Sequence, residues 1–204
     1  MGLYDLIFRR RPPIRERAEI ADFIDDQSAF LVQKGIYEYS RARSGHYSKV
    51  LFAEAEFKAA VEHARWSAYP LGLAMVGEMV AGVLQKHAED RRAIVDALTP
   101  LVLSVFDRYP IPEALGPGPW REARQELSLR LDRVGTHPPK PVKDIPVPLA
   151  ESYFNLMPIH EKLRGPDFPT LRNYMRVTLI NSHDELVKRL DAPAVIHALG
   201  LRPK

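Results

Sequence analysis

One acidic residue, Glu78, stands in the most apolar stretch of the chain and is the side chain whose chemistry most needs an explanation. Residues 68–84 read AYPLGLAMVGEMVAGVL and contain no other Asp, Glu, Lys or Arg. An unpaired carboxylate buried in such surroundings is strongly destabilising, so it must be paired, solvated or protonated. The stretch therefore predicts either an ion pair that fixes the register of a helix or a carboxylate that binds a ligand.

The neighbours of Glu78 on a helical wheel suggest a polar seam. At 100° per residue, Glu78 shares its side of the helix with Ala74, Ala81 and Gln85, and the bulky residues face the other way. We expect Glu78 and Gln85 to line this seam, and His63 is the third candidate residue of a polar or ligand-binding site there. The side chains that we expect as partners of Glu78 are His63, Arg65, Lys34 and His183.

Other catalytic or metal-binding patterns are missing from the sequence. The chain has no cysteine, and its seven histidines form no His-x-x-x-His pair. Neither a glycine-rich phosphate loop nor a Gly-x-Ser-x-Gly elbow is present. We therefore name no catalytic residue and expect no metal and no cofactor, although whether the chain is an enzyme stays open.

A second group of polar residues follows the first long helical pattern. Residues 36–49, IYEYSRARSGHYSK, place tyrosines and cations around Gly45 and next to His46. Such a group can bind a phosphate or a carboxylate, but it is also typical of a helix end whose long side chains lie over apolar surface. If a ligand pocket exists, we expect it to be edged by Glu78 and the tyrosines near His46.

The first residues of the chain combine apolar side chains with a cluster of arginines. The first 17 residues contain five arginines and two acidic residues, which accounts for the whole net charge of +3. A basic tail on a balanced protein argues against a broad nucleic-acid surface, so no nucleic acid is expected. The tail can instead lie on an anionic membrane surface or bind a partner. The candidate contact residues are Leu3, Phe8, Arg9, Arg10 and Arg11.

The periodicity of the apolar residues predicts an all-α fold. We expect an irregular multi-helix bundle over residues 13–135, after a basic apolar tail at 1–12. An extended, proline-rich connector at 136–148 then leads to a C-terminal helical unit at 149–204 that packs on the bundle. Residues 68–84 are marginal in length for a membrane span, and their two-sided pattern favours a buried core helix.

Three local features of the predicted elements are specific enough to be tested. Pro70 should end or kink the helix that begins near Ser48. Residues 171–180 fit either a helix or a strand. Ser182 and Glu185 have the spacing of a capping box, so a helix should begin there.

These features predict a non-catalytic helical interaction or assembly protein of the cytoplasm, held at the inner membrane surface through its tail. A protein partner or self-association is expected. The alternative is a small-ligand-binding bundle, or an enzyme, with its pocket near Glu78.

Overall fold

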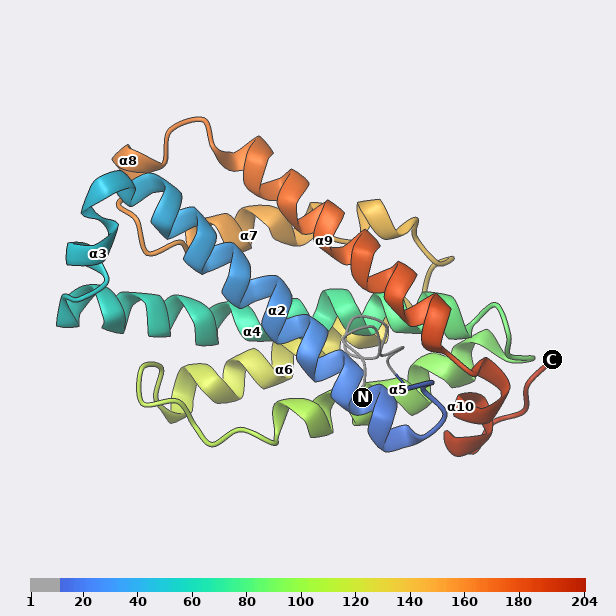
Figure 1. The fold of residues 1–204 in the computed structure, drawn as a ribbon. Coiled ribbons are helices and arrows are strands. Elements are labelled where there is room, and N and C mark those ends of the chain that lie inside the picture. The colour runs from blue at the N-terminus through green and yellow to red at the C-terminus, as the bar shows by residue number, and fades with distance from the viewer. Residues whose placement is uncertain (1–11) are drawn as a thin grey trace, which may run out of the picture.

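The computed structural model describes residues 12–204, which fold into helices without any strand (Figure 1). This confirms the predicted all-α class. The long helices cross one another around α4, which runs through the middle of the molecule (Figure 1). The helices are α2 (Arg17–Ser44), α3 (Ser48–Leu51), α4 (Ala55–Leu84), α5 (Arg91–Phe106), α6 (Pro117–Val134), α7 (Ala150–Asn155), α8 (Glu161–Arg164), α9 (Phe168–Arg189) and α10 (Ala192–Ala198).

Helix α4 forms the centre of the core and packs against α2, α5, α6 and α9. Among the described residues it is the one helix long and apolar enough to cross a membrane, but 78% of its most apolar window is buried within the protein. Of the two effects predicted for Pro70, the end of a helix is wrong, because α4 continues through Pro70. A proline inside a helix costs about 3 kcal/mol, and the buried side chains on both sides of Pro70 offset that cost.

Two glycines of α4 bring neighbouring helices close to its backbone. A Cβ at Gly72 would lie 3.0 Å from the carbonyl oxygen of Ser28 on α2. A Cβ at Gly77 would lie 3.1 Å from Leu131 Cδ2 on α6 and 3.2 Å from Val102 Cγ2 on α5. Gly72 and Gly77, which weaken α4 as an isolated helix, are therefore positions where neighbouring helices pack close to its backbone.

Helix α9 lies along α2 and carries the C-terminal part of the chain (Figure 1). It includes residues 171–180, so the ambiguity between helix and strand is resolved as helix. The predicted capping box is wrong, because Ser182 lies inside α9 and not at its start. The Ser182 hydroxyl instead donates a hydrogen bond to Oε1 of Gln27 on α2, at 2.7 Å.

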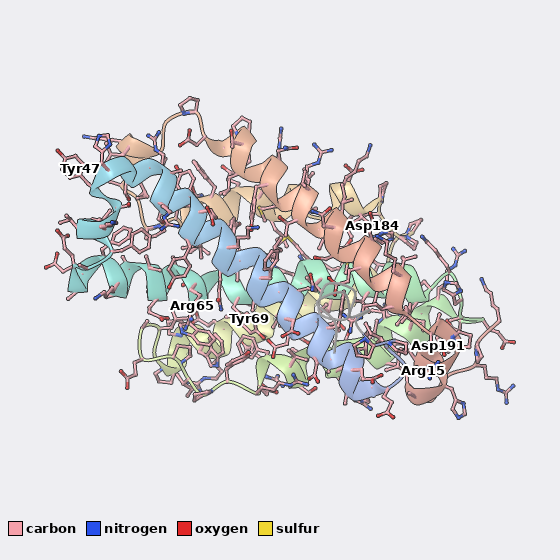
Figure 2. The ribbon with its side chains drawn as sticks, in the orientation of Figure 1. Arg15, Tyr47, Arg65, Tyr69, Asp184 and Asp191 are labelled. Atoms are coloured by element: carbon pink, nitrogen blue, oxygen red, sulfur yellow. The ribbon has the colours of Figure 1, made fainter. Side chains whose placement is uncertain are left out.

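The segment before α2 is fixed against the end of α9. The backbone N–H of Ile14 donates to the carbonyl of Arg189 at 2.8 Å, and the N–H of Asp191 donates to the carbonyl of Ile14 at 2.9 Å. The Arg15 guanidinium lies 3.2 Å from the Asp191 carboxylate, and both are labelled in Figure 2. The described part of the chain therefore begins beside the C-terminal end of α9.

The proline-rich connector is not extended along its whole length. Two 3-10 helices, η2 (Val142–Asp144) and η3 (Val147–Leu149), shorten its second half. Ile145 between them is only 3% exposed, and η2 packs against α9. The apolar residues among the prolines anchor the connector to the core, which the proline count alone did not reveal.

Candidate functional site

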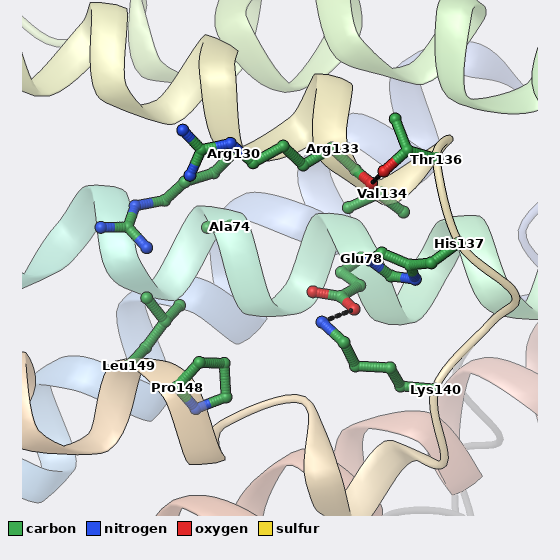
Figure 3. Close-up of a pocket in the computed structure, with 10 residues that line it drawn as sticks. All are labelled: Ala74, Glu78, Arg130, Arg133, Val134, Thr136, His137, Lys140, Pro148 and Leu149. Atoms are coloured by element: carbon green, nitrogen blue, oxygen red, sulfur yellow. Dashed lines mark hydrogen bonds and ion pairs between the residues drawn. The ribbon is translucent and has the colours of Figure 1, made fainter.

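Glu78 lies in an open pocket between α4, the last turns of α6 and the connector that follows it (Figure 3). The pocket has a volume of about 290 Å³, near the lower limit for sites that bind small molecules. Its charged lining residues are Glu78, Arg130, Arg133 and Lys140, so cations outnumber the single carboxylate. Its other lining residues are Ala74, Val134, Thr136, His137, Pro148 and Leu149.

The partner of Glu78 is Lys140, whose ammonium donates to the carboxylate at 2.8 Å. The Glu78 side chain is 14% exposed and that of Lys140 is 35% exposed. Lys140 reaches Glu78 on α4 because packing and a hydrogen bond hold the connector beside that helix. Leu149 is buried, and Arg176 on α9 donates a hydrogen bond to the carbonyl of Lys143 at 2.9 Å.

The four partners expected for Glu78 were wrong, because each of them lies elsewhere. Arg65 pairs with Glu62 one turn away at 2.8 Å, and the Lys34 ammonium lies over the ring of Phe30. His183 contacts its own neighbour, Asp184, at 3.2 Å. His63 is exposed on α4. The expectation did not include the connector, whose path across α4 cannot be read from helical periodicity.

The two other residues of the predicted seam do not join Glu78. Gln85 is buried, and its side-chain amide donates to the carbonyl of Arg91 at 3.2 Å, which ties the end of α4 to the start of α5. His63 lies fifteen positions before Glu78 on the same helix, about 22 Å away along its axis. Neither residue lines the Glu78 pocket.

The tyrosines near His46 belong to a different part of the molecule. Tyr37 lines a separate shallow pocket of about 280 Å³ with Phe52. The Tyr39 hydroxyl donates to the carboxylate of Asp167 at 3.1 Å, and burial together with this bond raises the pKa of Tyr39 to about 12. A single pocket edged by Glu78 and these tyrosines is therefore not formed.

Three donors, one from α4 and two from the turn after α5, meet at Asp25 on α2, a cluster that sequence reasoning missed. Asp25 accepts a hydrogen bond from the Tyr69 hydroxyl at 2.7 Å and another from the Tyr109 hydroxyl at 3.0 Å. The Arg108 guanidinium lies 3.4 Å from the same carboxylate. Burial, then the bond to Asp25, raises the pKa of Tyr69. These bonds satisfy the partly buried carboxylate and connect α2, α4 and the turn after α5.

The outward face of α9 carries a regular row of exposed residues, which we name the α9 seam. Its members alternate in steps of four and three positions, the spacing of a heptad repeat. Val177 and Val187 are about half exposed, and Ile180 is 36% exposed. Asp184, labelled in Figure 2, has a side chain that is 58% exposed. The α9 seam consists of Asn173, Val177, Ile180, Asp184 and Val187, all of them exposed.

Two further sets of predictions concern the N-terminal tail and metal ions. Leu3, Phe8 and the arginines at positions 9–11 lie outside the described residues. Within residues 12–204, no group of three or more His, Cys, Asp or Glu residues is placed to hold a metal ion.

Comparison of the chain with protein-family models, with curated proteins and with solved structures finds no match.

Proposed function

We propose that the chain is a non-catalytic helical interaction protein that assembles with a second copy of itself through the α9 seam. The observation that carries this proposal is the heptad spacing of five exposed residues on the outer face of one helix. Apolar residues that recur with this spacing along one exposed face are the contact row that a helix uses when it packs on another helix.

The polar residues of the α9 seam favour an antiparallel pair in one register. Antiparallel helices related by a two-fold axis place residues on either side of the axis opposite one another. With the axis between Thr178 and Leu179, Val177 of one copy faces Ile180 of the other. Asp184 then faces Asn173, whose side-chain amide can donate to the carboxylate.

A shifted register is also compatible with the heptad, but it brings unlike groups together. It places Val177 opposite Val187 and sets the carboxylate of Asp184 against Ile180. Burying a carboxylate against an apolar side chain removes it from water without supplying a new donor, which opposes association, so this register is disfavoured. Polar residues in a contact row select the register in this way in other helix pairs.

The length of the α9 seam sets the expected strength of the assembly. From Asn173 to Val187 the helix rises about 21 Å, which is two heptads. A contact of this size falls below the area of a standard stable interface, so we expect dimers to form at high micromolar concentrations and to dissociate on dilution.

Sedimentation equilibrium over a range of concentrations tests the proposed function. The unaltered chain should move from monomer towards dimer as its concentration rises, and Ile180→Asp should remain a monomer throughout. Leu129→Asp is the matched control, because Leu129 is 52% exposed on α6, outside the α9 seam, and it should dimerise normally. Monomeric behaviour of the unaltered chain at all concentrations would contradict the proposal.

We also propose that the tail adds a membrane contact, with Leu3, Phe8 and the arginines at positions 9–11 at an anionic surface of the cytoplasmic side. The supporting observation is the fixed position of the segment that follows the tail. Arg189 donates a hydrogen bond to the carbonyl of Pro12 at 3.0 Å, at the C-terminal end of α9. The tail therefore joins the rest of the chain beside α9, the helix that carries the α9 seam.

A further inference from the structure

We infer that the Glu78 pocket binds a small anion through the guanidinium groups of Arg130 and Arg133. The ligand class is a compound with a carboxylate or phosphate group. This inference is independent of the proposed assembly, because the pocket and the α9 seam share no residue.

The arrangement of charge in the pocket is two-sided. Figure 3 shows the guanidinium groups of Arg130 and Arg133 on one side of the pocket and the Glu78–Lys140 pair on another. Because Lys140 is bound to Glu78 at 2.8 Å, the carboxylate is largely neutralised. An anion that enters next to the arginines therefore meets a cationic wall without an opposing free carboxylate.

The two arginines have unused hydrogen-bond donors. Arg130 forms one ion pair, with Glu126 at 3.0 Å, and its Nε–H is buried without a partner. The Arg133 guanidinium has no hydrogen bond or ion pair to any described residue. A buried donor without a partner is uncommon in folded proteins, and a missing ligand or water is one of its ordinary explanations. Guanidinium groups match the planar oxygens of carboxylate and phosphate.

Arg133 also has a structural explanation that does not involve a ligand. It lies in the last turn of α6, where the helix dipole favours a cation. This explains why a basic residue is present there. It does not explain why the buried Nε–H of Arg130, one turn earlier, faces no acceptor.

The remaining walls limit the size of the ligand. Ala74, Val134 and Leu149 supply apolar surface, and Thr136 lies at the rim with His137. A volume of about 290 Å³ accommodates a compound of roughly a dozen heavy atoms or fewer. The small volume, the apolar walls and the two guanidinium groups together suit a compact organic anion with a short apolar part.

Binding of inorganic phosphate and of acetate tests the inference, with sodium chloride at equal ionic strength as the reference. Two-dimensional NMR of the full chain should show saturable shifts of the backbone N–H signals of Thr136 and His137. The double variant Arg130→Gln/Arg133→Gln should weaken this binding at least about tenfold, since each lost bond to a charged group is worth roughly that factor. Arg121→Gln, on an exposed part of the same helix, should bind as the unaltered chain does.

Each arm of the experiment decides one question. Saturation by phosphate alone or by acetate alone identifies the anion class within the proposal. Equal shifts with chloride, linear shifts without saturation, or unchanged binding by the double variant would overturn it. The monomeric variant Ile180→Asp should still bind the anion, so failure of the assembly proposal and failure of the anion site are distinguishable.

Discussion

Glu78 on α4 and Lys140 in the connector form an ion pair at 2.8 Å across 62 positions of the sequence. The pair links the central helix to the segment that leads to the C-terminal part of the fold. Because Glu78 is mostly buried and Lys140 is partly exposed, we expect a coupling free energy of about 1 kcal/mol. A double-mutant cycle of Glu78→Gln and Lys140→Met, followed by urea unfolding, measures it.

The ion pair between Arg92 and Asp96 is the control for this cycle. It has the same length, 2.8 Å, but both side chains are about half exposed and lie one turn apart on α5. Its coupling should be no more than about 0.5 kcal/mol. Equal coupling in the two pairs would show that partial burial between α4 and the connector makes this ion pair no stronger than a surface pair.

Gly35 on α2 should tolerate no side chain. A Cβ there would collide with the Tyr153 hydroxyl and would lie 2.8 Å from Tyr174 Cε1. The Tyr153 hydroxyl is fixed by its hydrogen bond to the carbonyl of Val32 at 2.8 Å. Gly35→Ala should therefore lower the free energy of unfolding by about 1–3 kcal/mol or more, as measured by urea denaturation.

Gly82→Ala provides the comparison for this substitution. A Cβ at Gly82, inside α4, would meet only Pro139 Cβ, at an ordinary contact distance of 3.7 Å. Alanine has the higher helix propensity, so this variant should be as stable as the unaltered chain or slightly more stable. A similar loss at both positions would contradict the packing described around Gly35.

Stability should fall in alkaline solution because buried tyrosines resist ionisation. Burial raises the pKa of Tyr174 to about 12, and burial with the bond to Asp167 raises that of Tyr39 to about 12. Above pH ~10 the unfolded chain loses these protons while the folded chain keeps them, so unfolding is favoured as pH rises from about 10 to about 12. Thermal unfolding at several pH values should show this loss, and Tyr174→Phe should reduce its slope. An unchanged slope would show that Tyr174 ionises equally easily in both states.

The tail should attach the chain to anionic vesicles. Removal of residues 1–11 should abolish co-sedimentation with vesicles that contain phosphatidylserine, because it removes three arginines together with the apolar residues. Vesicles of phosphatidylcholine alone should bind neither form. Equal sedimentation of the full and shortened chains would exclude the tail as the membrane contact.

Much of the fold could be predicted from the sequence, because helical periodicity and end signals are local. The residues around Gly45 are typical of a helix end, and α2 does end at Ser44, followed by Gly45 with a positive φ of 54° that suits glycine. Pro70 misled the prediction because its local cost is overcome by tertiary packing, which is not visible locally. Ser182 was wrongly predicted to begin a helix, because its hydroxyl donates a hydrogen bond to Gln27 on another helix instead of capping a helix end.

The sites could be predicted less well, because they depend on contacts between distant segments. An ion pair was one of the alternatives predicted for Glu78, and it is present, but the identity of Lys140 as the partner depends on the route of the connector. Asp25 gave no signal, since its donor Tyr69 comes from α4 and its donor Tyr109 from the turn after α5. The α9 seam could have been found from its heptad spacing had residues 171–187 been read as one helix.

Cross-linking across the α9 seam tests the central claim most directly. The chain contains no cysteine, so introduced thiols give an unambiguous signal. Copies with Asn173→Cys, enlarged by a tag, are mixed with untagged copies that carry Asp184→Cys and treated with a short bismaleimide. The proposed register predicts a cross-linked species with the mass of one tagged and one untagged copy. Absence of that species, or preferential cross-linking of Ile180→Cys to Asp184→Cys, would contradict it.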